Sequence, residues 1–330
     1  MMEGIKITKK PRLRNPYLIV AWPGMGEVAF KAATFLVEKL KAEEFAAIPS
    51  EEFFYFTGSV ITKGIIGIPE LPQGKFYFWK NPATKGVPRA DVHDLIIFIS
   101  NAQPDLARAE EYSKRIVELA KDFKVKTVVG FASMPQAIDH TQDAAVWFTA
   151  TSQAVIDNFK KFNFHLLTDG QISGMNGLFL GVAKAHGFEG FCLLGEIPLY
   201  TIQIENPRAS AAVLEAFAKI LNIQFGVSDL LEQAHTMEAE INKLLEYLKV
   251  GPQGSQPITE EDIEKIKKSL TQLTKLPVSI KDRIEKLFQE AKANLGRANE
   301  LKVELDRWNV YKEYEDRFLD LFRKAKGKGN

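Results

Sequence analysis

The feature that constrains the fold most is the alternation of short apolar runs with longer amphipathic runs from Tyr17 to about Asn222. Several short runs are apolar throughout, which is typical of strands that are covered on both faces. Strands interleaved with helices predict a three-layer αβα domain. The expected strands are Leu18–Ala21, Phe45–Ile48, Phe76–Trp79, Leu95–Ile99, Thr127–Phe131, Val146–Thr149, Phe164–Leu167 and Phe191–Leu194. The expected helices are Val28–Lys41, Asp105–Phe123, Ser152–Lys161, Gly177–His186 and Arg208–Leu221.

Residues 45–80 depart from a regular strand and helix alternation, because they hold several strand-like pieces and no helical pattern. Glycines at positions 58, 64, 67 and 74 separate these pieces. Such a stretch predicts a β-rich excursion with mixed or antiparallel pairing. The expected fold class is therefore α/β, with a mixed sheet between two helical layers.

After Gly226 the sequence becomes helical, with Ser228 as a plausible N-cap. Glycine, proline and small polar residues then fill Gly251–Pro257, a composition typical of a linker. The sequence Ser279-Ile-Lys-Asp282 resembles a capping box and leads into a narrow apolar stripe from Ile284 to Trp308. We therefore expect a domain over residues 1–250, a linker over 251–258, and a hairpin-like helical extension over 259–330 that ends in a basic tail.

The charge balance and the scattered histidines exclude several classes of function. The chain holds 43 basic and 42 acidic residues, a formal net charge of +1, which argues against a general DNA-binding or RNA-binding role. The single cysteine, Cys192, cannot form an internal disulfide and is expected to be a buried structural thiol. The five histidines lack zinc-ligand spacing, so no metal site is expected; His93 and His140 are expected to be solvated loop residues.

The chain also lacks the sequence signals of secretion and of the membrane. The basic N-terminal segment has no apolar core of the kind that a secretory signal needs. No apolar run approaches the roughly 20 residues that cross a bilayer. A soluble, cytoplasmic protein that does not contact membranes is therefore expected.

The first candidate site is the turn that follows the strand ending at Ala21. Gly24, Gly26 and Ala29 satisfy the relaxed form of the dinucleotide fingerprint. Glu27 counts against a nucleotide, because its carboxylate on the first helical turn repels a pyrophosphate seated there. The alternative is a structural turn between strand and helix.

The second candidate site is the glycine-rich stretch Thr168–Glu196. Gly170, Gly174 and Gly177 follow the end of a strand, and the N–H groups of the next helix can bind an anion. No Lys-Ser or Lys-Thr pair follows the glycines, and Ser173 lacks the spacing of a nucleophile elbow. The alternative is that these glycines let the loop and the helix pack closely on the sheet.

Three stretches together resemble the proteasome assembly chaperone family: Leu18–Ala29, Thr168–Gly187, and Leu193–Pro198 followed by Glu205–Leu248. The resemblance implies an αβα fold related to purine nucleoside phosphorylases, assembled into homo-oligomers. It also implies protein partners, since eukaryotic members escort proteasome α-subunits, and it brings no established catalytic residues. Some archaeal members touch the proteasome through a C-terminal hydrophobic-Tyr-x tail. This chain ends Lys-Gly-Asn, so that docking tail is not expected here.

Two hypotheses of function follow. The first is a non-catalytic, homo-oligomeric, chaperone-like protein that needs no cofactor and binds copies of itself and a protein client or assembly partner. The second is an enzyme or sensor that binds a nucleoside or a phosphorylated metabolite at the two glycine-rich turns, so the question of catalysis stays open. The candidate ligand-binding residues are Gly24, Gly26, Glu27, Gly170, Ser173, Gly174, Asn176, Gly177 and Glu196.

Overall fold

The computed structural model of the chain describes residues 4–56, 58–82, 92–162, 164–250, 278–307 and 310–326. Its internal contacts divide it into two compact units. The first unit comprises Met1–Met134, Asp143–Glu196 and Glu205–Glu232. The second comprises Pro135–Gln142, Ile197–Ile204 and Gln233–Asn330. The predicted linker over residues 251–258 lies outside the described residues.

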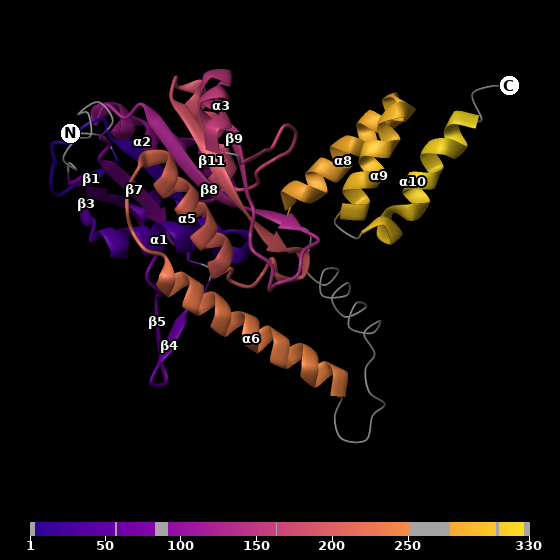
Figure 1. Cartoon of the computed structure of the whole chain (residues 1–330), viewed down its shortest axis with the longest axis horizontal. Coiled ribbons are helices and arrows are strands. Elements are labelled where there is room, and N and C mark those ends of the chain that lie inside the picture. The colour runs from indigo at the N-terminus through magenta and orange to yellow at the C-terminus, as the bar shows by residue number, and fades with distance from the viewer. Residues whose placement is uncertain are drawn as a thin grey trace. The chain divides into compact units, whose positions relative to one another are not determined.

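A large mixed sheet forms the centre of the first unit (Figure 1). Its nine strands among the described residues follow the order β1-β3-β6-β7-β2-β8-β11-β9-β10. The central strand β2 is parallel to both of its neighbours, β7 and β8, so the carboxyl ends of these three strands lie at one edge. The strands are β1 Lys6–Ile7, β2 Tyr17–Ala21, β3 Glu43–Ile48, β6 Gly74–Trp79, β7 Leu95–Ser100, β8 Thr127–Gln136, β9 Val146–Ala150, β10 His165–Leu166 and β11 Glu189–Pro198.

The predicted β-rich excursion over residues 45–80 is confirmed. The strands β3, β6 and β7 pair antiparallel with one another in turn, which makes the sheet mixed. Between β3 and β6 the chain leaves the sheet and forms a separate two-stranded hairpin, β4 Val60–Thr62 and β5 Ile65–Gly67. The φ angles of Lys63 and Gly64 are +51° and +81°, the left-handed pair that joins hairpin strands with their natural twist.

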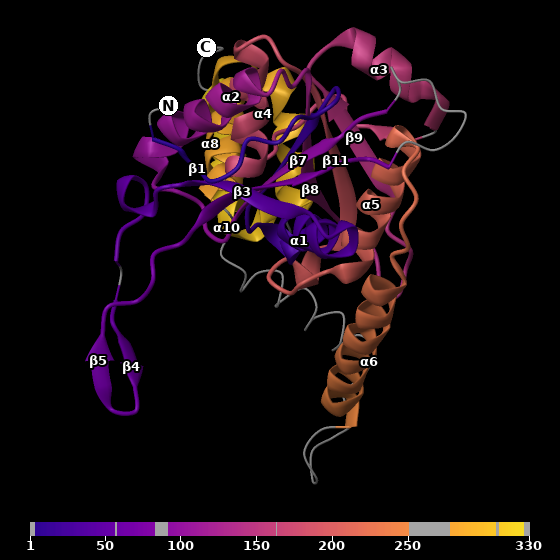
Figure 2. The same ribbon diagram turned by 90° about the vertical axis from the view of Figure 1, so that its left-hand side faces the viewer.

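Helices cover both faces of the sheet (Figure 2). α1 and α5 pack together on one face, and α2 and α4 pack together on the other. Leu18 and Val20 of β2 belong to the apolar core beneath α2 and α4, while Ile19 between them points to the other face and is equally buried. This explains why β2 is apolar throughout, and it confirms an α/β fold with a mixed sheet. These helices are α1 Val28–Leu40, α2 Ala109–Asp122, α3 Gln153–Phe159, α4 Met175–Ala185 and α5 Pro207–Leu221, and α6 Ser228–Val250 follows.

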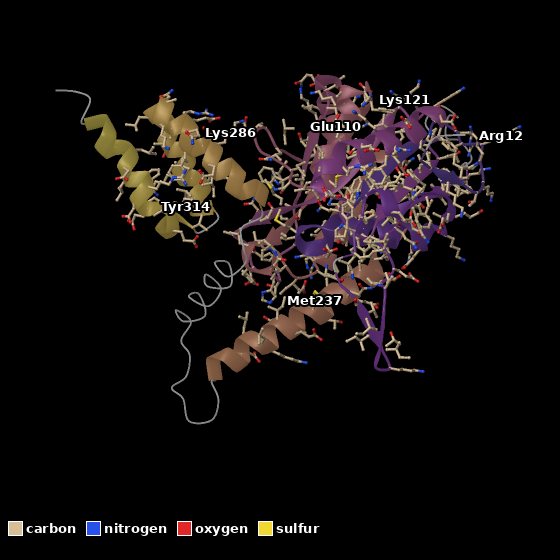
Figure 3. The ribbon with its side chains drawn as sticks, turned by 180° about the vertical axis from the view of Figure 1, so that it is seen from behind. Arg12, Glu110, Lys121, Met237, Lys286 and Tyr314 are labelled. Atoms are coloured by element: carbon tan, nitrogen blue, oxygen red, sulfur yellow. The ribbon has the colours of Figure 1, made fainter. Side chains whose placement is uncertain are left out.

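The C-terminal part of the second unit holds three helices among the described residues, α8 Val278–Ala293, α9 Ala298–Arg307 and α10 Tyr311–Lys326. The apolar stripe that begins at Ile284 is divided between α8 and α9, because the Asn294 side chain caps a short turn by accepting a hydrogen bond from the Gly296 N–H. Phe288 of α8 contacts the ring of Tyr314 in α10 at 5.8 Å between centroids. Figure 3 shows the Tyr314 side chain on this helix. None of the helices in the described ranges is long and apolar enough to cross a membrane.

Candidate functional site

The first glycine-rich turn joins β2 to α1 and is held by backbone hydrogen bonds. Gly26 has a φ of +62°, which favours glycine, and Glu27 follows at +50°. The Glu27 N–H donates to the Gly24 carbonyl oxygen at 3.0 Å, and the Asn206 N–H donates to the Gly26 carbonyl oxygen at 2.8 Å. The turn is thus fixed both to itself and to the segment that precedes α5.

Asn176, on the first turn of α4, reaches across to the end of β2. Its Oδ1 accepts a hydrogen bond from the Trp22 N–H at 3.0 Å, and its Nδ2 donates to the Trp22 carbonyl oxygen at 3.0 Å. Both residues are buried. A methyl group added at Gly24 would lie 3.3 Å from the Asn176 Nδ2. The structure therefore places the two glycine-rich turns next to each other and joins them through the Asn176 side chain.

Gln103, which follows β7, makes a second bridge between the same turns. Its Nε2 donates to the Pro23 carbonyl oxygen at 2.9 Å, and its Oε1 accepts from the Met175 N–H at 3.1 Å. At Gly174, whose φ is +68°, an added Cβ would lie only 2.8 Å from that Oε1. Gln103 could not be selected from the sequence, because an isolated glutamine in a loop belongs to no recognisable motif.

A ligand-binding role for the second turn would need free N–H groups at the N-terminus of α4 to bind an anion, and several of these groups are already bonded. The first N–H of α4, on Met175, bonds to Gln103. Two further N–H groups of its first turn, on Gly177 and Leu178, donate to the Gly174 carbonyl oxygen at 3.2 and 3.0 Å. The N-terminus of α4 has therefore satisfied these three donors within the protein.

The electrostatics of the first turn also disfavour an anion. Burial raises the pKa of Glu27, and the nearby Glu205 carboxylate raises it further, against a lowering effect of the hydrogen bond from Gly24. Glu205 itself pairs with Lys31 at 2.6 Å. A bound phosphate would add a third negative group to this cluster.

The structure places Glu196 away from the two turns, in β11. Its Oε1 accepts a 2.7 Å hydrogen bond from the Trp147 Nε1, and its Oε2 accepts from the Ala145 N–H at 3.3 Å. These two hydrogen bonds join β11 to β9 and to the residue just before it, so the role that the structure shows for Glu196 is to stabilise the pairing of these two strands. Ser173 lies in the loop before α4.

A pocket of about 270 Å³ is lined in part by the second glycine-rich stretch. Of the candidate residues only Gly170 and Gly177 line it, so the two turns do not open onto this pocket together. Cys192 also lines it and is buried, as predicted, and burial raises the pKa of its thiol. The other lining residues are Thr149, Ala150, Thr151, Leu167, Thr168, Ile172, Leu180, Gly181, Lys184 and Phe191.

His140 corrects one expectation, because it is buried and not solvated. Its Nδ1 lies 2.8 Å from the Tyr200 hydroxyl, and its Nε2 lies 3.0 Å from the Asn242 Oδ1. Both partners belong to the same unit as His140. The described residues contain no group of three or more side chains arranged to hold a metal ion.

Among the described residues of the first unit, exposed large apolar side chains are concentrated on the hairpin and on the chain that leads to it. Seven large apolar side chains there are each at least 44% exposed. We call this set the apolar arm: Tyr55, Phe56, Val60, Ile61, Ile65, Ile66 and Ile68. The hairpin projects from the sheet and its helices (Figures 1 and 2). The exposure of these residues could not be predicted from the sequence, because consecutive isoleucines are equally typical of a buried strand.

Comparisons with known proteins agree with this architecture. The profile of the PAC2 family matches residues 18–245. An uncharacterised protein of Methanocaldococcus jannaschii, MJ1210, is 32% identical over 280 residues, which cover 81% of this chain and 100% of that protein.

Two crystal structures from Pyrococcus furiosus are similar over most of their length. PbaB, an archaeal proteasome activator, has 26% identity and a TM-score of 0.62, covering 73% of this chain and 97% of that one. PbaA, an archaeal homolog of proteasome-assembly chaperone, has 24% identity and a TM-score of 0.54, covering 79% and 99%. The resemblance drawn from the sequence is confirmed: the chain belongs to the PAC2 family.

Proposed function

We propose that this protein is a homo-oligomeric, chaperone-like binding protein that acts through protein–protein contacts and not through catalysis. Its membership of the PAC2 family supports a chaperone-like role, as does its similarity to PbaB, a proteasome activator. The single observation that carries the proposal is the apolar arm.

The apolar arm presents apolar side chains on both faces of its hairpin. Ile61 and Ile66 are directly opposite in the register and share one face, while Val60 and Ile65 occupy the other. The four isoleucines of the arm are between 69% and 78% exposed. An isolated two-stranded hairpin is marginally stable in water, so a surface that covers it also stabilises it.

The area and the charge of the arm favour a second copy of this chain as its occupant. At about 200 Å² for a fully exposed large side chain, its exposed fractions amount to roughly 900 Å², close to the roughly 800 Å² that one partner contributes to a standard interface. Lys63 is its only charged residue between Tyr55 and Ile68. Permanent interfaces are the most apolar ones, and most soluble oligomers are built from identical chains.

The second hypothesis, a nucleoside or phosphorylated metabolite bound at the two glycine-rich turns, has less support. Asn176 and Gln103 occupy the space between the turns, and Gln103 takes the first N–H of α4. Such a ligand would have to displace both side chains.

The finer features of the proposal rest on the sequence. The resemblance implies a phosphorylase-like fold for the domain over residues 1–250. Composition indicates the linker over 251–258, apolar periodicity indicates the helical extension over 259–330, and the missing secretion and membrane signals favour a location in the cytoplasm. In this proposal the apolar arm makes the self-contacts, and a protein client binds the assembled oligomer.

Size-exclusion chromatography with light scattering tests the proposal. The purified chain is expected at an integral multiple of its 37.1 kDa, because the arm is covered by another copy. A single species of 37.1 kDa over a range of micromolar concentrations would refute self-assembly.

A further inference from the structure

The pocket beside the second turn is built from three elements of the first unit. Gly177, Leu180, Gly181 and Lys184 of α4 line one side, at spacings that place them on one helical face. The opposite side is the sheet, and the loop from Leu167 to Ile172 closes a third side.

The register of the sheet brings hydroxyl groups to the floor of the pocket. Cys192 of β11 is directly opposite Thr149 of β9, so the two side chains share a face of the sheet. Thr151, two residues further along, shares that face as well. The Thr151 hydroxyl accepts a 2.8 Å hydrogen bond from the Gly190 N–H, which leaves its own hydrogen free to donate.

Two glycines of α4 line the pocket, and close packing requires glycine at only one of them. At Gly177 an added Cβ would lie 2.0 Å from the Ile172 carbonyl oxygen, so the close approach of the loop requires glycine there. At Gly181 an added Cβ would meet no atom within 4 Å. Glycine is less favourable than alanine inside a helix, yet Gly181 stands in the interior of α4 and keeps the pocket open.

The charge of the lining is positive. Lys184 is the only charged residue among the described residues that line the pocket. No hydrogen bond or ion pair within the described part of the chain engages its ammonium group. Most of the remaining lining is apolar, from Leu167, Ile172 and Leu180.

We propose that this pocket binds a small organic carboxylate with an apolar body, whose carboxylate pairs with Lys184. The threonine hydroxyls orient the bound molecule, and the leucine and isoleucine side chains cover its apolar part. A volume of about 270 Å³ lies near the lower end of known ligand pockets, so the ligand is small. A carboxylate is favoured over a phosphate, because the nearby N–H groups of α4 at Met175, Gly177 and Leu178 are already bonded within the protein.

Isothermal titration calorimetry on the full chain tests the proposal with phenylacetate and hexanoate, each paired with its neutral amide, and with inorganic phosphate. We expect each carboxylate to bind about two- to fivefold more tightly than its amide, since the ion pair with the exposed Lys184 is lost in the amide. Equal affinity for acid and amide, tighter binding of phosphate than of both acids, or no binding of either acid at about 10 mM would overturn the proposal.

Matched variants locate the binding. Lys184→Met is expected to weaken carboxylate binding about two- to fivefold, while Lys219→Met, in the last turn of α5, leaves it unchanged. Gly181→Leu is expected to abolish binding by filling the pocket, with a melting temperature that shows the chain still folds. Unchanged binding in both Lys184→Met and Gly181→Leu would contradict the assignment, whatever the oligomeric state of the chain.

Discussion

The side-chain amide of Asn176 bonds to both backbone polar groups of Trp22, a residue 154 positions earlier in the chain. The two hydrogen bonds, each 3.0 Å long, continue the pairing of β2 beyond its last residue, Ala21. The two glycine-rich turns, whose sequences suggest a ligand-binding site, are thus joined by the side chain of Asn176.

Replacing Asn176 by alanine is expected to destabilise the protein by about 2–4 kcal/mol, because the buried N–H and carbonyl of Trp22 both lose their partner. Denaturant unfolding measures the loss. Asn176→Asp is expected to cost at least as much, since a carboxylate would face the Trp22 carbonyl oxygen. A change below about 0.5 kcal/mol for Asn176→Ala would show that water replaces the side chain at no cost.

Two glycine substitutions on the same segment are expected to act in opposite directions. Gly174→Ala is expected to lower the free energy of unfolding by about 1–3 kcal/mol, because the φ of +68° and the contact with Gln103 both disfavour a Cβ. Gly181→Ala is expected to raise it by about 0.5–1 kcal/mol, because its Cβ meets open space inside a helix. The same sign for both variants would be incompatible with this geometry.

The raised pKa of Glu27 predicts a pH-dependent gain from its removal. Because burial raises the pKa of Glu27 in the folded state, the folded protein binds a proton more readily than the unfolded chain does. The stability of the protein therefore falls as the pH rises from the pKa of Glu27 in the unfolded chain to its higher pKa in the folded protein. Glu27→Gln is therefore expected to raise the melting temperature at pH 7, and the gain is expected to disappear near pH 4.

Glu110→Gln serves as the control of opposite sign. The hydrogen bond from Lys114 lowers the pKa of Glu110, so this variant is expected to lose a little stability at pH 7 and none once acid protonates both states. A lower melting temperature for Glu27→Gln at pH 7 would contradict the assigned direction.

The buried contacts of His140 predict the effect of removing one hydroxyl. Tyr200→Phe is expected to destabilise the second unit by about 1–3 kcal/mol. The backbone N–H of His140, which donates to the Tyr200 hydroxyl at 2.9 Å, would lose its acceptor. Tyr77→Phe, in β6, is the matched control and is expected to be near neutral, since no hydrogen bond of its hydroxyl is found in the described ranges. Equal thermal shifts in the two variants would show that the contact contributes nothing.

Much of the fold follows from the sequence because burial on both faces leaves a local signature. Leu18, Ile19 and Val20 are consecutive apolar residues with no exposed face, and they form the centre of the sheet. The limits of elements are harder to predict. α4 begins at Met175, two residues before the expected Gly177, because Gln103 and Gly174 complete its first turn.

The candidate site was predictable only in part, because its geometry depends on residues distant in sequence. The glycines indicated where the turns are, but neither Gln103 nor the role of Asn176 has a local pattern. The isoleucines of the apolar arm carry no sign of exposure, since Ile61 and Ile66 read like buried strand residues. Their exposure follows from the chain leaving the sheet between β3 and β6.

In the proposed function, the apolar arm holds copies of this chain together. Light scattering on the double variant Ile61→Thr/Ile66→Thr tests it most directly, because threonine keeps the β-branched shape and removes the apolar contact. The control is Leu244→Thr/Val303→Thr, which changes two other exposed apolar residues. The arm variant is expected to fall to 37.1 kDa, while the control is expected to keep the mass of the unmodified protein. An arm variant that folds and retains the full oligomeric mass would contradict this role of the arm.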